Sequence, residues 1–498
     1  MTLSRLPEPD RGVLARSSAI VEDLVKLIGA ESVIADEDGR RAFEADALTA
    51  YRRMPLAVVL PRSTEDVAKV LKYCHQNRLK VVPRGAGTSL SGGALPAEDA
   101  IVIGISRMNR ILDVDFENRA MRVETGITNL AITEAVAAEG FFYAPDPSSQ
   151  LACTLGGNLA MNSGGAHCLK YGVTTNNVLG LRMVLMDGEI VDIGGPYLDS
   201  EGYDFLALVV GSEGQFGIIT EATVRILPKA ESARPILLGF GSSAAAGSCV
   251  AAIIASGIIP VAIEFMDKPA IAVAEAYAKA GYPLDVEALL IVEVEGSPEE
   301  VNRLLADIVE IAKGFQPKVI EPATSPEHSA KIWKGRKAAF PAAGRISPDY
   351  YCMDGTIPRG ALPRVLARMG EMSRRYGLRV ANVFHAGDGN LHPLILYDAN
   401  KPGDLETAEA FGADILRLCV EVGGVLTGEH GVGVEKRDLM PAMFSEIDLN
   451  QQQRLKCAFD DKGLLNPGKV FPTLHRCAEL GRVHVHGGRL RFAEIPRV

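Results

Sequence analysis

A glycine-rich segment that directly follows a strand–helix–strand pattern constrains the fold of this chain more than any other feature. An apolar run at 57–61 precedes a stretch that begins at Ser63, and a second apolar run leads straight into RGAGTSLSGG at 84–93. Within the stretch, one helical face is apolar and carries Val67, Val70, Leu71 and Cys74. This βαβ pattern predicts an α/β layer that ends in a loop able to approach a ligand closely.

The loop at 84–93 lacks the residues of two familiar nucleotide sites. Leu90 stands where a dinucleotide fingerprint needs its third glycine, and no Gly-Lys-Ser/Thr follows for a P-loop. The glycines still let backbone N–H groups approach an anion, next to the hydroxyls of Thr88, Ser89 and Ser91 and the charge of Arg84. We therefore expect a pyrophosphate here; the alternative is a loop whose glycines only make tight turns.

The order of elements along the chain predicts its division into parts. Two further glycine-rich segments lie in the first half, at 154–165 and 211–217, and a polar, turn-rich stretch at 228–235 predicts a domain boundary. The strands and helices beyond it favour an α+β domain with a mostly antiparallel sheet. We expect an N-terminal helical segment over 1–50, then domains over 51–230 and 231–425, a helical segment over 426–472 and a basic tail over 473–498.

Composition excludes several classes of protein. A net charge of −10 argues against a dedicated nucleic-acid-binding protein, which needs a basic surface. The 8 cysteines form no CxxC pair, which argues against zinc, iron–sulfur or dithiol chemistry and favours a reducing compartment. The uncharged stretch at 235–263 is broken by glycine, serine and proline, so it predicts a buried strand–helix–strand unit and no transmembrane segment. Without a secretory signal, the protein is expected to be cytoplasmic.

The segment VFHAGDGNLHPL at 383–394 is the sharpest local signal for chemistry. If Asp388 and Gly389 form a two-residue hairpin turn, His385 lies directly opposite His392. Opposed side chains have Cβ atoms about 4.5–5.5 Å apart, so both imidazoles can reach one divalent ion. Glu429, beside His430 in TGEHGVG, offers a third ligand and leaves positions open for a substrate. The alternative is that these histidines are hydrogen-bonded core residues.

Several segments, in the same order, are similar to the FAD-binding domain of the vanillyl-alcohol-oxidase type, also called PCMH-type. They are VVPRGAGTSLSGG, PDPSS at 145–149, TLGGNLAMNSGGAHCLKYG, GSEGQFGIITEATVRILP and NPGK at 466–469. This resemblance covers residues 50–472 and implies an α+β fold, in which two subdomains hold FAD and precede a ferredoxin-like cap domain and a C-terminal helical segment. It implies that FAD is lined by Arg84, Gly85, Ala86, Gly87, Thr88, Ser89, Pro145, Ser148, Thr154, Gly157, Asn158, Ser163, Gly164, Ile218, Ile219 and Asn466. Because the first glycine loop carries no histidine for covalent attachment, the resemblance implies non-covalent FAD.

HAGDGNLH and GEHG also resemble the metal-binding and active-site motifs of FAD-dependent 2-hydroxyacid dehydrogenases, a family that includes glycolate and D-lactate enzymes. The resemblance implies a zinc, manganese or iron ion held by His385, His392 and Glu429, with His430 as the base. It also implies that Arg336 binds the substrate carboxylate, with Arg345 in reserve. A 2-hydroxy acid would lose its hydroxyl proton to the base while a hydride passes to flavin.

The stretch KGRKAAFPAAGRISPDYYCMDGTIP at 334–358 is similar to the flavin subunits of bacterial glycolate oxidases. Cys352 and Leu394 stand where relatives that accept dicarboxylic acids carry a basic and a polar residue, so a small 2-hydroxy acid is implied. The resemblance further implies a second flavin-domain subunit and an iron–sulfur subunit as partners, and through them a peripheral place at the inner membrane. The basic tail is a candidate docking segment. A stand-alone D-lactate dehydrogenase and an inactive flavin- or metal-binding scaffold remain the alternatives.

Overall fold

Two separate sheets form the first half of the structure, which the computed structural model describes over residues 7–197 and 202–472. The first sheet has the order β1-β2-β4-β3, and its strands are Val33–Ile34, Ala57–Val59, Ala100–Gly104 and Lys80–Arg84. Strands β2 and β3 both run parallel to β4. Helix α4 (Thr64–Asn77) joins β2 to β3 and begins at Ser63, whose side chain accepts the Asp66 N–H. The predicted βαβ unit is therefore confirmed.

The N-terminal segment belongs to this first sheet. It contains the expected helices α1 (Arg11–Leu14), α2 (Ser17–Ile28) and α3 (Glu37–Arg41), and α2 packs on α4. It also contains β1, which pairs antiparallel with β2. The expected division at residue 50 therefore cuts through a sheet.

The second sheet is antiparallel and has the order β5-β6-β10-β8-β9. Its strands are Ile111–Asp115, Ala120–Glu124, Ile218–Arg225, Val178–Val184 and Ile190–Gly194. The short strands β7 (Phe141–Phe142) and β11 (Leu227–Pro228) pair beside it. The helices of this part are short: α5 (Asn129–Val136), α6 (Leu155–Met161), α7 (Cys168–Tyr171) and α8 (Phe205–Val209).

The cap begins with a ferredoxin-like unit. Strands β12 (Ser232–Phe240), β13 (Ala262–Asp267), β14 (Ala288–Gly296) and β15 (Val319–Pro322) form an antiparallel sheet in the order β15-β12-β14-β13. Side chains alternate between its faces: Ile236 and Leu238 pack in the core that contains α9 (Ser243–Ala255) and α11 (Pro298–Lys313), whereas Leu237 packs with α10 (Lys268–Ala278) and α12 (Pro326–Ala343). The stretch at 235–263 is thus strand–helix–strand, as predicted. No helix within the described residues is long and apolar enough to cross a membrane.

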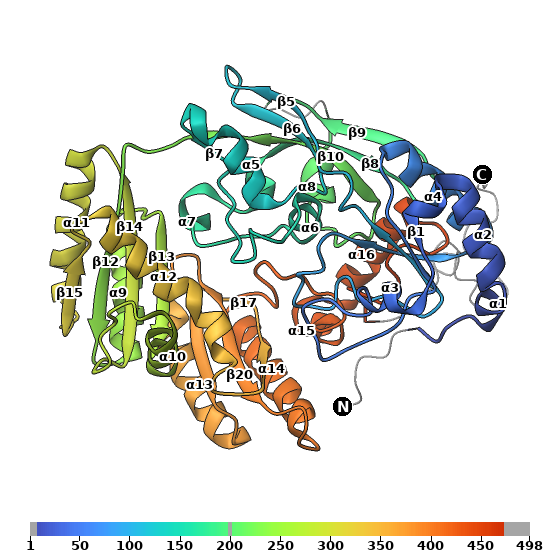
Figure 1. Cartoon of the computed structure of the whole chain (residues 1–498). Helices are drawn as coiled ribbons and strands as arrows, with labels where there is room; N and C mark the ends of the chain where they lie inside the picture. The colour runs from blue at the N-terminus through green and yellow to red at the C-terminus, as the bar shows by residue number, and fades with distance from the viewer. Residues whose placement is uncertain (1–6, 198–201, 473–498) are drawn as a thin grey trace, which may run out of the picture.

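The rest of the cap continues the sheet from β13 through the hairpin strand β18 (Val380–His385). Strands β19 (Asn390–Leu391), β17 (Gly355–Thr356), β20 (Pro393–Tyr397) and β16 (Asp349–Cys352) complete it. Helices α13 (Leu362–Tyr376) and α14 (Asp404–Glu421) cover this region, as Figure 1 shows in orange. The α+β fold with a mostly antiparallel second domain is confirmed.

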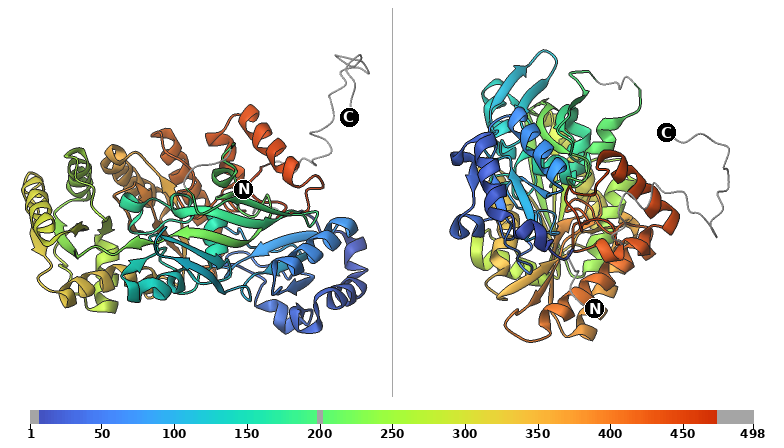
Figure 2. Two further views of the ribbon diagram at one scale, coloured as in Figure 1. Left: turned by 90° about the horizontal axis from the view of Figure 1, so that it is seen from above. Right: turned by 90° about the vertical axis from the view of Figure 1, so that its right-hand side faces the viewer.

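The C-terminal segment returns from the cap to the first sheet. After α15 (Met440–Met443) and α16 (Glu446–Phe459), Leu465 forms a parallel bridge with Val81 of β3. Leu464 and Leu465 pack in the same core as α2, α4 and β3. Figure 2 shows an elongated molecule with the cap at one end and the blue N-terminal helices at the other, and α16, in red, lies on the opposite side of the molecule from those helices. The basic tail at 473–498 lies outside the described residues.

Candidate active site

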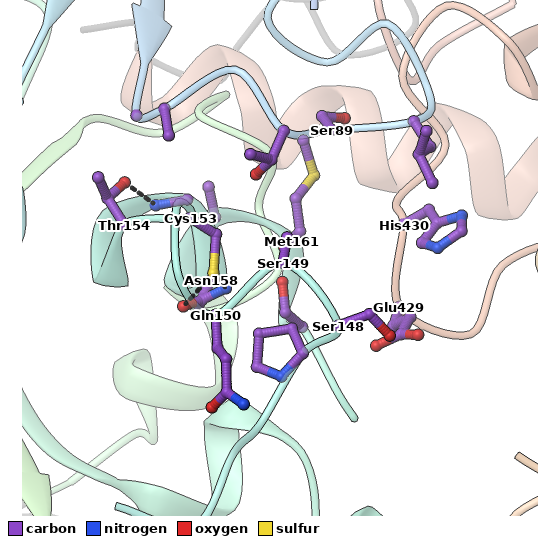
Figure 3. A pocket seen from close by; sticks show the side chains of 18 of the residues that line it. Ser89, Ser148, Ser149, Gln150, Cys153, Thr154, Asn158, Met161, Glu429 and His430 are labelled. Atoms are coloured by element: carbon purple, nitrogen blue, oxygen red, sulfur yellow. Dashed lines mark hydrogen bonds between the residues drawn. The ribbon is translucent and has the colours of Figure 1, made fainter. Parts of the chain in front are cut away.

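A cavity of about 1120 Å³ lies where the glycine-rich loops, the cap and the C-terminal segment meet. This volume is slightly above the range of about 300–1,000 Å³ that is typical of small-molecule sites. Figure 3 shows Ser89 on one wall, Thr154 and Asn158 on a second, and Glu429 and His430 on a loop across from them. Segments far apart in the sequence therefore share one cavity.

Most of the residues predicted to contact a cofactor line this cavity. They are Arg84, Gly85, Ala86, Gly87, Thr88, Ser89, Ser148, Thr154, Gly157, Asn158, Ser163, Ile218, Ile219 and Asn466. Pro145 and Gly164 are not in the lining. The carbonyl of Pro145 accepts a hydrogen bond from Asn129, and the Gly164 N–H donates to Glu429, which lines the cavity.

The first glycine loop presents a row of free backbone donors. Within the described part of the chain, the N–H groups of Ala86, Gly87, Thr88 and Ser89 donate to no other residue. Successive free N–H groups of this kind form an anion-binding concavity. A Cβ at Gly85 would lie only 2.3 Å from the Thr154 hydroxyl, so glycine is needed where the first two glycine-rich segments meet. The donors and the space fit the pyrophosphate of an extended dinucleotide.

Gly87 gives a specific test of this loop. It has a φ of +75°, and a Cβ there would meet the Arg84 guanidinium at 2.1 Å. Gly87→Ala should therefore displace Arg84 and weaken FAD binding about 10–100-fold, the loss of one charge-assisted hydrogen bond. Gly140→Ala is the matched control in fluorescence titrations with FAD, because Gly140 has a φ of +76° but open space around it. Equal affinities of the two variants would contradict the role given to Arg84.

The register of the histidine hairpin differs from the prediction. His385 pairs with Asn390, not with His392, so the predicted direct pairing is wrong. The turn is longer because the Asp388 side chain accepts the Asn390 N–H and Gly389 adopts a φ of +84°. The shift is by two residues, which leaves both histidines on the same face of the sheet. Their ring centroids lie 5.2 Å apart.

His385, His392 and Glu429 form a group of potential metal ligands. Their donor atoms lie within 4.8 Å of one another. Glu429 Oε1 is 3.3 Å from His392 Nε2 and 3.6 Å from His385 Nε2. Both ring nitrogens of His392 are buried, and neither forms a well-aligned hydrogen bond within the described residues although Nε2 lies near Glu429 and Asp354, which is costly for polar atoms. An ion bound by these three side chains would satisfy His392, so the residues fit a divalent metal.

His430 lies directly beside this group. Its ring stacks on that of His392, with centroids 4.9 Å apart and an interplanar angle of 6°. Burial lowers the pKa of His430 to about 4, so the imidazole is neutral near pH 7. A neutral, cavity-lining imidazole next to a metal-ligand group can accept a proton.

Two carboxylates that sequence reasoning missed hold the loop that carries Glu429 and His430. Asp354 accepts the N–H groups of Gly428, Glu429 and His430 at 3.1, 3.2 and 2.9 Å. Glu213 accepts the next N–H groups, those of Val432 and Gly433, at 2.7 and 2.8 Å. Both carboxylates are buried. The sequence offers little local signal for either: Asp354 follows the strand β16, and Glu213 lies within the glycine-rich segment GSEGQFG.

Helix α12 supplies one wall of the cavity. Trp333, Arg336, Lys337 and Phe340 line it, at the spacing of a single helical face. Arg336 is buried, and its Nε and Nη2 lie 2.7 and 2.6 Å from Glu264 Oε2, whereas Nη1 bonds to no described residue. Arg345 is exposed, stacks on Tyr277 and does not line the cavity. The structure thus brings Arg336, but not Arg345, to the site.

An imidazolium joins the first half of the chain to the cap. His167 Nδ1 lies 2.7 Å from Asp146 Oδ2, and its Nε2 lies 3.3 Å from Glu293 Oε2 on β14. Burial favours the neutral ring, but the charges and hydrogen bonds of the two carboxylates outweigh it and raise the pKa of His167 to about 10. The segment AHCLKYG, in which His167 lies, therefore clamps the two parts together.

This clamp predicts a pH-dependent stability. The folded-state pKa of about 10 exceeds the unfolded value of about 6.5, so the stabilisation is fully present below pH 6.5 and is lost as the pH rises through 10. We expect the Tm of the wild type to exceed that of His167→Gln at pH 6, with a gap that shrinks towards pH 10. A gap that stays constant over this range in thermal unfolding would contradict the ionised clamp.

Comparisons with known proteins agree with this architecture. Residues 55–194 match the family model described as FAD binding domain, and residues 229–470 match that of FAD linked oxidases, C-terminal domain. The chain is 52% identical to the glycolate oxidase subunit GlcD of Escherichia coli K12, over 91% of both chains. It is 38% identical to GlcD of Bacillus subtilis (91% of this chain, 96% of the relative) and 32% identical to a D-lactate dehydrogenase of Archaeoglobus fulgidus (91% and 99%).

Solved structures share the fold at low sequence identity. p-Cresol methylhydroxylase aligns with a TM-score of 0.80 and 16% identity, over 93% of this chain and 98% of that one. A 4-ethylphenol oxidase from Gulosibacter chungangensis aligns with a TM-score of 0.77 and 17% identity, over 94% and 99%. The PCMH-type fold expected from the glycine-rich segments is confirmed. The chain belongs to the FAD-linked oxidases, in the group that contains the GlcD subunits of glycolate oxidase and D-lactate dehydrogenases, and is an FAD-dependent oxidoreductase.

Proposed function

We propose that the protein oxidises a small 2-hydroxy acid, glycolate to glyoxylate, at the junction of the cavity and the histidine hairpin. The observation that carries the proposal is the group His385, His392 and Glu429 beside the neutral His430, all on the wall of one FAD-sized cavity. The similarity to GlcD subunits favours glycolate over D-lactate, which is the second candidate because of the D-lactate dehydrogenase relatives.

Separate sets of residues would bind the cofactor and the metal. FAD, bound without a covalent link, supplies the acceptor for the substrate hydride. The free N–H groups of the first glycine loop, with Arg84, hold its pyrophosphate, and Asn466 closes the site through hydrogen bonds to the carbonyls of Gly93 and Glu213. His385, His392 and Glu429 would hold a zinc, manganese or iron ion, which would lower the pKa of the substrate hydroxyl.

Two residues act on the substrate itself. His430 takes the hydroxyl proton, because its imidazole is neutral and lines the cavity. Arg336 binds the substrate carboxylate through Nη1, since Glu264 already occupies its other edge. The substrate thus loses its hydroxyl proton to His430 and a hydride, which carries two electrons, from its α-carbon. The product is the 2-oxo acid.

The similarity to GlcD subunits favours a small acid. Cys352 and Leu394 lie directly opposite each other on β16 and β20, but both are buried in the apolar core shared with α12 and neither lines the cavity. Support for a small acid therefore comes from the relatives and not from these two positions. Steady-state rates with an artificial electron acceptor test this: kcat/KM should fall in the order glycolate, D-lactate, D-2-hydroxyglutarate. A preference for the dicarboxylic acid would overturn the proposed substrate class, and a preference for D-lactate would favour the second candidate.

The electrons need an acceptor outside the chain. We propose that they pass to partner subunits, a second flavin-domain subunit and an iron–sulfur subunit, because the similar GlcD chains are themselves subunits. This assembly would give the chain a peripheral place at the inner membrane. Co-purification of the two partners with the tagged chain is the expected result, and full activity with quinone from the isolated chain would contradict it.

The metal group predicts a further measurable effect. His392→Ala removes one of the three proposed ligands, so the bound metal per chain should fall at least about tenfold while FAD content stays unchanged. Elemental analysis of the purified proteins measures the metal content. His328→Ala is the control, because His328 pairs with Glu321 near the start of α12 and does not line the cavity. A metal content equal to that of the wild type would remove His392 from the ligand set.

A further inference from the structure

Glu264 is a charged residue in the middle of a buried strand. Five of the six residues of β13 are buried, and Glu264 is 0% exposed between the apolar Ile263 and Phe265. A carboxylate in such a place is unfavourable unless charges and hydrogen bonds compensate it. None of the roles proposed above for ligands, base or cofactor contacts accounts for its presence.

The two oxygens of Glu264 contact two different functional residues. Glu264 lies opposite His385 in the β13–β18 pair, and its Oε1 accepts a hydrogen bond from His385 Nδ1 at 2.7 Å. Its Oε2 accepts a hydrogen bond from Nε of Arg336 and forms an ion pair with Nη2 of the same residue, which lies on α12. One carboxylate therefore contacts both a proposed metal ligand and the proposed carboxylate-binding arginine.

The hydrogen bond to His385 determines which ring nitrogen carries the proton. An ionised carboxylate only accepts hydrogen bonds, so His385 must donate from Nδ1. When the ring is neutral, as metal binding requires, its lone pair therefore lies on Nε2, the atom that is 3.6 Å from Glu429 Oε1. Metal-binding histidines commonly donate their other N–H to a carboxylate, which fixes the tautomer and the orientation of the ring.

We propose that Glu264 is a positioning residue that prepares His385 Nε2 for the metal and holds Arg336 in one orientation. The inference rests on the proposed function of the site. Its consequence is that metal loading and substrate-carboxylate binding both depend on one carboxylate that touches neither the metal nor the substrate.

Glu264→Gln tests this in the full-length chain with FAD bound, after the metal has been removed by a chelator. Glutamine keeps the size of the side chain but neither balances the charge of Arg336 nor forces His385 to donate. We expect the affinity for Zn²⁺, measured by calorimetry, to fall about 10–100-fold, with FAD content unchanged. At saturating metal, the KM for glycolate should rise more than kcat falls.

Glu293→Gln is the matched control. Glu293 is buried on the neighbouring strand β14, on the same face of the sheet, and also lines the cavity, but it bonds to Trp333 and His167 rather than to a metal ligand. The Zn²⁺ affinity of the Glu293→Gln protein should equal that of the wild type. An equal loss in both variants would mean that any buried charge on this face matters, and would overturn the specific role of Glu264.

A second variant covers the case in which Glu264→Gln does not fold. Glu264→Asp keeps the charge that Arg336 needs but shortens the side chain, so it should retain FAD and still lose Zn²⁺ affinity. Unchanged Zn²⁺ affinity in FAD-bound Glu264→Gln or Glu264→Asp would overturn the role of Glu264 but would leave the proposed function of the site untouched. A wild type that binds no Zn²⁺ and is not reduced by glycolate overturns the proposed function instead.

Discussion

Replacing His430 with alanine should lower the rate at which glycolate reduces the bound flavin by about 10²–10⁴-fold, the usual contribution of a general base. The neutral imidazole, with a pKa of about 4, lies next to the proposed metal ligands and can accept the hydroxyl proton. Anaerobic stopped-flow absorbance measures the rate directly, without an electron acceptor.

Two measurements show whether the loss in His430→Ala comes from the base itself. FAD content and Zn²⁺ content should equal those of the wild type, because His430 belongs to neither proposed set. His328→Ala, outside the cavity, should reduce its flavin at the wild-type rate. A wild-type rate in His430→Ala would exclude His430 as the base.

Asp354→Asn should destabilise the protein by about 3–5 kcal/mol, the typical effect of removing one partner of a buried ion pair. Asp354 Oδ2 lies 3.4 Å from Nζ of the fully buried Lys436, and the carboxylate also accepts three successive backbone N–H groups. An amide in its place presents an NH₂ group to these donors. Urea unfolding measures the change, and the loop with Glu429 should lose metal affinity as well.

Asp388→Asn is the matched control for that experiment. Asp388 is a carboxylate on the nearby hairpin, and within the described residues its side chain accepts a single N–H, that of Asn390. Its replacement should change the unfolding free energy by about 1 kcal/mol or less. Equal destabilisation by the two variants would contradict the account of Asp354 as the anchor of the 427–430 loop.

The histidine hairpin illustrates what could be predicted from the sequence. The spacing of His385 and His392 predicted that both rings would meet, and they do. The register was wrong because the Asp388 side chain and the positive φ of Gly389 stabilise a longer turn than a two-residue hairpin. Since the error is an even number of residues, the face on which the histidines lie, and hence the chemistry, was unaffected.

The carboxylates that organise the site could not be predicted in the same way. Asp354, Glu213 and Glu264 each act through tertiary contacts with segments far away in the sequence. Single acidic residues in apolar stretches carry no periodic signal, so their partners appear only when the sheet and loops are assembled. Arg336 shows the converse: its place at the site was predicted from the family resemblance, but its pairing with Glu264 was not.

The most direct test of the central claim is the visible absorbance of the purified protein, recorded without oxygen before and after addition of glycolate. The account predicts a flavin band that glycolate bleaches, faster than D-lactate does, in protein loaded with metal. A flavin band that glycolate leaves unchanged in the metal-loaded protein, with and without its partner subunits, would contradict it.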